Sequence, residues 1–133
     1  MHRTKTDVDR HVQELFRKIK SAHERHLKCY NIAKLYYKVG AYGAAKRHAL
    51  MYLSVHENND NAHQLLGDCH EKLGEIDRAI AEYKRSLELD PNQPGLILKS
   101  KHIFLYFRHF FTHQQYLLTQ AVSEICGSEG LIL

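Results

Sequence analysis

The chain matches itself without gaps when it is shifted by 34 residues. Residues 26–59 align with residues 60–93, so that small residues lie over small ones and apolar residues over apolar ones. The aligned pairs are Ala33 with Gly67, Val39 with Leu73, Gly40 with Gly74, Tyr42 with Ile76, Ala45 with Ala79, Leu53 with Leu87 and Val55 with Leu89. Such a period is typical of solenoids built from two-helix units, which bind other macromolecules and rarely catalyse reactions. The repeat therefore predicts an all-α scaffold.

The composition agrees with a helical globular chain. Proline occurs only at Pro91 and Pro94, and glycine seven times in 133 residues, so helix breakers are few. The three widely spaced cysteines favour reduced thiols in a cytosolic or nuclear setting. The polar start of the chain predicts no secretory signal. Residues 103–118 are apolar but interrupted by charge and too short to span a bilayer, so no membrane insertion is expected.

The hydrophobic spacing predicts a lead-in helix followed by two hairpins. The lead-in helix is expected at about residues 7–20, opened by a capping box of Thr6 and Asp9. Its apolar stripe consists of Val8, Val12, Leu15, Phe16 and Ile19. The hairpins are expected at residues 24–38 with 42–55 and 60–73 with 76–89, turning at Gly40 and Gly74, and the second ends at Asp90 and Pro91. Between the helices of the second hairpin we expect Leu66, Leu73, Ile76, Ile80, Tyr83 and Leu87.

The second unit resembles the tetratricopeptide repeat family. Its family-like positions are Leu66, Gly67, Ala79, Tyr83 and Pro91, whereas His63, His70 and Ser86 replace the usual Trp, Tyr and Ala. The first unit keeps Tyr36, Gly40 and Ala45 but has Ala49 and Glu57 at the aromatic and proline places. The resemblance implies an α-solenoid with a capping helix at residues 1–25 and repeats at 26–59 and 60–93. Residues 94–133 are expected to begin a third unit and then to pass into a divergent tail.

A narrower resemblance runs from residue 3 to about residue 99. The segments RTKTDVDR, AKLYYKVGAYGAAK, AHQLLG and YKRSLELDPNQ are similar to the N-terminal domain of the Ran-binding nucleoporins, which belong to the cytoplasmic filaments of the nuclear pore. This implies a protein-interaction scaffold for nucleocytoplasmic transport, with nucleoporins or transport factors as partners. The implied location is the cytoplasmic side of the nuclear pore, or otherwise the cytoplasm. Ran-binding and SUMO-ligase regions have no counterpart here.

The family pattern also implies a peptide-binding concave groove formed by the first helix of each unit. The outward positions are Leu27, Tyr30, Lys34 and Tyr37 in the first unit and Asn61, Gln64, Asp68 and Glu71 in the second. The groove would be aromatic and basic at one end and acidic at the other, and tyrosine suits peptide contacts. Alternatively, the two tyrosines pack against the lead-in helix.

Some family members clamp a C-terminal carboxylate in this groove. The corresponding positions here are Tyr30, Lys34, Leu65, Gly95 and Lys99. Most of them lack the hydrogen-bond donors that a carboxylate needs, so a clamp of this kind is not expected.

Positive charge collects in the first half of the chain. Residues 1–50 carry 12 Lys and Arg against 4 Asp and Glu, whereas residues 51–100 carry 5 against 9. One interpretation is an ordinary solvated helix face. Another is weak, salt-dependent RNA binding through Arg3, Lys5, Arg17, Lys18, Lys20, Arg25 and Lys28.

No enzyme, cofactor or metal site is predicted. The sequence contains no glycine-rich phosphate loop and no nucleophile motif. His102, His109 and His113 could share one helix face, but no carboxylate or cysteine lies beside them at ligand spacing.

The repeat pattern stops after Lys99. Lys101 and His113 stand where a third unit would place a small residue and an alanine, and a cap at Thr112 is expected to open a further helix ending at Gly127. The tail is either a divergent hairpin that covers the second unit or the unrelated C-terminus of a truncated or alternatively spliced product. In the second case the chain could be a paralogue fragment without independent function.

Overall fold

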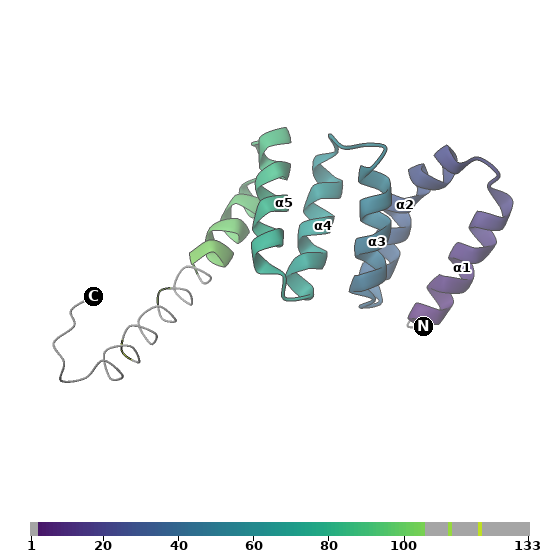
Figure 1. The fold of residues 1–133 in the computed structure, drawn as a ribbon, viewed down its shortest axis with the longest axis horizontal. Helices are drawn as coiled ribbons and strands as arrows, with labels where there is room; N and C mark the ends of the chain where they lie inside the picture. Colours follow the sequence, from purple (N-terminus) through teal and green to yellow (C-terminus); the bar gives the residue numbers. More distant parts are fainter. Residues whose placement is uncertain (1–2, 106–111, 113–119, 121–133) are drawn as a thin grey trace.

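The computed structural model of the chain describes residues 3–105, 112 and 120. Its helices are α1 (Lys5–Lys18), α2 (Ala22–Lys38), α3 (Tyr42–Leu53), α4 (Asp60–Lys72) and α5 (Ile76–Leu89), and residues 94–105 are also helical. Consecutive helices contact each other and stand in a row, as Figure 1 shows. The described residues contain no strand. The predicted all-α helical solenoid is therefore confirmed, and the predicted helix ends are right to within two residues.

Both hairpins turn through the same backbone motif. Gly40 and Gly74 have φ angles of +80° and +79°, a region that glycine enters without a steric penalty. The residue after each glycine donates its N–H to the carbonyl five residues earlier, at 2.9 Å from Ala41 to Tyr36 and 2.8 Å from Glu75 to His70. This bond satisfies a carbonyl that the end of the preceding helix leaves free. The 34-residue period of the sequence is thus repeated in the backbone geometry.

The capping box of α1 lies two residues earlier than predicted. Thr4 and Asp7 form it: the N–H of Asp7 donates to Thr4 Oγ1 at 3.3 Å, and the N–H of Thr4 donates to Asp7 Oδ2 at 3.1 Å. The predicted pair, Thr6 and Asp9, has the same spacing but lies inside the helix. Asp9 instead accepts a hydrogen bond from the hydroxyl of Tyr36 in α2, so its carboxylate is committed to a contact between helices.

The lead-in helix packs on the first hairpin, as its apolar stripe predicts. Val8 and Val12 of α1 are buried in one cluster with Ile32 and Tyr36 of α2. Ile19 is also buried, while Leu15 and Phe16 are half-buried beside the cluster. At about 25 cal/mol for each Å² of buried apolar area, such side chains contribute roughly 1.5–3 kcal/mol each.

The second hairpin is packed around Tyr83. Its ring is fully buried, and Gly67 lies against it so closely that a Cβ at Gly67 would be 2.5 Å from Tyr83 Cε1. Of the other residues predicted between these helices, Leu66 is buried, and Ile76, Ile80 and Leu87 are half-buried. The prediction for Leu73 is wrong: this residue is 41% exposed. It is the C-cap of α4, where the chain already leaves the helix, so its side chain does not follow the packed face.

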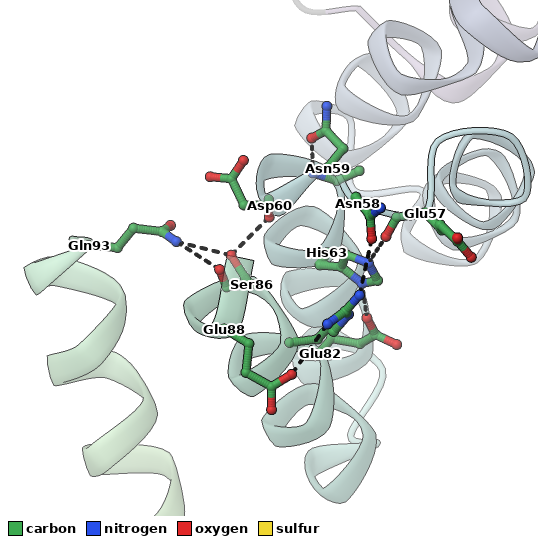
Figure 2. Close-up of polar contacts among 11 residues, drawn as sticks. Glu57, Asn58, Asn59, Asp60, His63, Glu82, Ser86, Glu88 and Gln93 are labelled. Carbon is green, nitrogen blue, oxygen red and sulfur yellow. Dashed lines mark hydrogen bonds and ion pairs between the residues drawn. The ribbon is translucent and has the colours of Figure 1, made fainter. Parts of the chain in front are cut away.

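Two residues that depart from the family pattern form polar contacts at the junction between the units. Figure 2 shows His63 between the α3–α4 loop and α5, with Nδ1 2.7 Å from Glu82 Oε2 and Nε2 2.7 Å from the carbonyl oxygen of Glu57. Ser86 is fully buried, and its hydroxyl donates to the carbonyl of Asp60 at 2.9 Å. His63 of α4 thus links the carbonyl of Glu57 in the preceding loop to Glu82 of α5, and the Ser86 bond joins α5 to the first residue of α4.

Residues 94–105 begin a further layer against α5. Leu96 is buried with Ala79 and Tyr83, and Ile103 packs against the same cluster. The helical character predicted for the start of the tail is thus present in residues 94–105. His109, His113 and Gly127 lie outside the described residues, and so does the rest of the predicted tail hairpin except Thr112 and Gln120. No helix in the described part of the chain is both long and apolar enough to cross a membrane.

Candidate peptide-binding face

The eight residues predicted to line the groove lie on two helices that contact each other. Leu27, Tyr30, Lys34 and Tyr37 are on α2, and Asn61, Gln64, Asp68 and Glu71 are on α4. Spacings of three and four residues place each set along one side of its helix. Because α2 and α4 are in contact, the two sets lie on neighbouring helices. We refer to these eight residues as the predicted groove face.

Tyr30 is held in a small aromatic stack. Its ring centroid lies 5.4 Å from that of Tyr52 in α3, and Asn59 donates to the Tyr52 hydroxyl at 3.2 Å. Burial raises the pKa of Tyr30, and the nearby Tyr52 and Asp60 add to this effect. Lys34 Nζ lies 5.4 Å from the centroid of the Tyr30 ring, within the range of a cation–π contact. Tyr30 therefore contacts α3 and its own helix, and it also packs against the apolar cluster that includes Ala62 and Leu66 of α4.

Tyr37 links the α2 and α4 parts of the face. Its half-buried ring packs edge-on against Tyr42, with 5.2 Å between the ring centroids. Burial raises the pKa of Tyr37, and the negative charge of Asp68 on α4 adds to this effect. Tyr37 also packs against the apolar cluster that contains Val8 and Val12 of the lead-in helix, and its neighbour Tyr36 donates to Asp9 of that helix.

The acidic end of the predicted groove face is occupied by groups from the protein itself. The Tyr83 hydroxyl lies 2.6 Å from Asp68 Oδ1 and 2.7 Å from Glu71 Oε2, so its single proton is shared between two acceptors. Lys99 Nζ lies 2.7 Å from the same Asp68 oxygen and 3.1 Å from the same Glu71 oxygen. One ammonium and one hydroxyl thus serve both carboxylates. We call these four residues the Tyr83 cluster.

The electrostatics of the Tyr83 cluster agree with this geometry. Burial raises the pKa of Tyr83, and the hydrogen bonds to Asp68 and Glu71 raise it further. Burial acts to lower the pKa of Lys99, but the contacts with the two carboxylates outweigh this effect, so the pKa is raised. Lys99 is therefore charged at neutral pH and is committed to the two acids. Local sequence patterns do not predict the pairing of Lys99 with Asp68 and Glu71, because these partners are about 30 residues away in the chain.

Most of the positions that correspond to a carboxylate clamp have no side chain available to bind a ligand carboxylate. Leu65 is buried, Gly95 has no side chain, and Lys99 is bound to Asp68 and Glu71. Of the two lysines among these five positions, Lys34 is the one without an acidic partner. No carboxylate oxygen in the described part of the chain lies within ion-pair distance of it.

The described residues offer no arrangement for metal or thiol chemistry. Among them, no group of three or more His, Cys, Asp or Glu side chains is placed to hold a metal ion. Cys29 and Cys69 are free and buried. Burial raises the pKa of the Cys69 thiol to about 12 and also raises that of Cys29, so neither forms a thiolate at neutral pH.

The comparison with protein families decides the nature of the second hairpin, because the tetratricopeptide repeat profile matches residues 60–93. Residues 60–93 are a tetratricopeptide repeat. The tetratricopeptide repeat is a protein-interaction fold built as a non-catalytic scaffold. The predicted family is thus confirmed at the unit whose residues follow the pattern most fully.

The similarity to curated proteins extends over most of the chain. The chain is 36% identical over 99 residues to human "RANBP2-like and GRIP domain-containing protein 8". This match covers 74% of this chain and 6% of that protein. The identity and the share of this chain are the same for human "E3 SUMO-protein ligase RanBP2", of which 3% is covered. Human "RANBP2-like and GRIP domain-containing protein 1" is 42% identical over 73 residues, 55% of this chain and 4% of that protein. The chain therefore spans only a small part of the length of these relatives.

Proposed function

We propose that the chain is a protein-interaction scaffold that acts in nucleocytoplasmic transport. Its partners are nucleoporins or transport factors, and its location is the cytoplasmic side of the nuclear pore. The observation that carries this proposal is the 36% identity to RanBP2 over 74% of the chain. The matched region of RanBP2 is 3% of that protein, so its ligase activity is not carried over.

The geometry of the predicted groove face supports a binding role for this region. Leu27 is 41% exposed although it is apolar, and Lys34 is exposed on the same side of α2. Tyr30 and Tyr37 are half-buried, so each presents part of a fixed ring. A rigid aromatic side chain with an apolar neighbour and a cation is the kind of surface that anchors a protein ligand at low entropic cost.

Proximity labelling in cells tests this proposal. The full chain is fused to a biotin ligase, and the labelled proteins are compared with those of a variant carrying Leu27→Asp and Lys34→Glu. Enrichment of nucleoporins or transport factors by the wild type, reduced in the variant, is expected. If the wild type labels no such protein above a ligase-only control, the proposal is wrong.

RNA binding is the second candidate, and it rests on the charge of the N-terminal half. Four of the predicted cations, Arg17, Lys18, Lys20 and Lys28, are exposed and make no ion pair within the described residues. By contrast, Lys5 pairs with Asp9 at 2.8 Å, and Arg25 donates to the carbonyls of Ile19 and Phe16. Fluorescence anisotropy with a labelled oligouridylate should show affinity that falls steeply with salt concentration. Absence of binding at low salt would dismiss this candidate.

The alternative of a fragment without independent function predicts a different melting behaviour. The apolar clusters of the chain are shared between units, since one of them joins Ala33 and Ala49 of the first unit to Ala62 and Leu66 of the second. A shared core should melt as one cooperative transition. A broad, non-cooperative thermal melt followed by circular dichroism would instead support the fragment alternative, because short repeat arrays are marginally stable.

A further inference from the structure

We propose that the α2 part of the predicted groove face binds a peptide in which an acidic side chain stands close to a large apolar one. The peptide carboxylate pairs with Lys34, and the apolar side chain packs on Leu27 and the Tyr30 ring. This inference rests on the proposed function in one respect only, namely that this surface binds a protein segment.

The Tyr83 cluster excludes the acidic end of the face as the main anchor for charge. Asp68 and Glu71 already receive the Lys99 ammonium at 2.7 and 3.1 Å and the Tyr83 hydroxyl at 2.6 and 2.7 Å. A basic ligand residue would have to displace Lys99, which is fixed by two carboxylates and lies 5.2 Å from the centroid of the Tyr83 ring. Lys99 therefore already pairs with both carboxylates of the acidic end when no ligand is bound.

Lys34 is the charge that the protein leaves available. It is exposed on α2, and its ammonium lies over the Tyr30 ring without a carboxylate partner in the described part of the chain. A lysine held near a ring has fewer conformations to lose on binding than a freely rotating one. A ligand carboxylate would meet this ammonium in a charge-assisted hydrogen bond, which is stronger than a neutral one.

The ligand side chain next to this carboxylate is expected to be apolar, because the residues one and two helical turns before Lys34 are Tyr30 and Leu27. Leu27 and Tyr30 lie seven and four residues before Lys34, which places all three on one side of α2. Leu27 is 41% exposed, and Tyr30 is immobilised by its stacking on Tyr52. An apolar ligand side chain can therefore remove both from water while an adjacent acid reaches Lys34.

Selection from a phage-displayed library of random twelve-residue peptides against the full chain tests the inference. We expect enriched sequences that combine Asp or Glu with a nearby Leu, Phe or Trp. For a synthetic selected peptide, Lys34→Gln should weaken binding by about fivefold to tenfold, and Lys34→Arg should restore it to within about twofold. Replacing the peptide acid by its amide should cost as much in the wild type and little in Lys34→Gln. Lys28→Gln, which changes an exposed lysine on another side of α2, is the matched control and should leave affinity unchanged.

Three results would overturn the inference. These are a selection that yields no binder, enrichment of basic peptides, or equal affinities for wild type and Lys34→Gln. Circular dichroism melts of each variant show that the fold is kept. If nucleoporins are still labelled in cells while these peptide results fail, the proposed function stands and only this inference is wrong. If the peptide results hold but no nucleoporin or transport factor is labelled, the peptide chemistry stands and the proposed function is wrong.

Discussion

A Cβ atom at Gly67 would lie 2.5 Å from Cε1 of Tyr83, closer than two such carbons can approach. The Tyr83 ring cannot move aside easily, because it is fully buried and its hydroxyl is hydrogen-bonded to Asp68 and Glu71. In the first unit the aligned positions are Ala33 and Ala49, both buried. The two units thus fill the same space differently: two alanines in one, and glycine with a large ring in the other.

Gly67→Ala is therefore expected to destabilise the chain although alanine favours helix. The gain in helix propensity is about 1 kcal/mol, whereas overpacking a rigid core costs roughly 1–3 kcal/mol or more. We expect a net loss of about 1–2 kcal/mol in the free energy of unfolding, measured by urea denaturation. Gly43→Ala is the control, because a Cβ there meets nothing within 4 Å and should not destabilise. A double-mutant cycle with Tyr83→Ala should show that the two changes are not additive, since removing the ring removes the clash.

Tyr36 should make the fold sensitive to alkali. Its pKa is raised from 10.0 to about 12, first by burial and then by the hydrogen bond to Asp9. As pH rises past 10, the unfolded chain loses this proton before the folded chain does. The stabilisation is therefore complete below pH 10 and is lost between pH 10 and about 12. We expect the Tyr36 share of the loss to be about 1–2 kcal/mol between pH 9 and 11.5. Tyr36→Phe should flatten this part of the profile, whereas Tyr42→Phe should not. An unchanged alkaline profile in Tyr36→Phe would contradict the assignment.

Lys99→Met tests the role of Lys99 in the Tyr83 cluster. Methionine keeps most of the aliphatic chain but removes the charge that neutralises Asp68 and Glu71. The Lys99 side chain is 38% exposed, so solvent screening limits the expected destabilisation to about 1 kcal/mol. The loss should shrink in high salt, where repulsion between the carboxylates is screened. Lys101→Met, at an exposed lysine on the same helix, is the control and should change stability by less than about 0.5 kcal/mol. Equal effects of the two substitutions would refute the role given to Lys99.

The repeat and its turns could be predicted because they follow from short-range rules. Gly40 and Gly74 mark the turns since they alone enter the left-handed region there. The choice between Thr4 and Thr6 as the helix cap could not be predicted from local spacing, because both precede an aspartate by three residues. The exposure of Leu73 depends on where α4 ends, which helical spacing does not fix.

The sequence predicts which residues belong to the candidate face, but not which of their charges are already paired within the protein. The resemblance to the tetratricopeptide repeat family implies outward positions for Asp68 and Lys34 on their helices. It does not reveal that Asp68 is bound by Lys99 from a later helix, or that Lys34 has no carboxylate beside it in the described part of the chain. Both facts depend on long-range packing, and they change a face with two charged ends into one whose available charge is positive.

The most direct test of the central claim places a photo-crosslinking amino acid, p-benzoylphenylalanine, at Leu27 or at Lys28 of the full chain in cells. The two positions are adjacent and both exposed, but they point to different sides of α2. Crosslinked products are identified by mass spectrometry. The account predicts adducts with nucleoporins or transport factors from position 27, few from position 28, and loss of the position 27 adducts when Lys34→Glu is added. Equal adducts from both positions, or none from position 27, would contradict it.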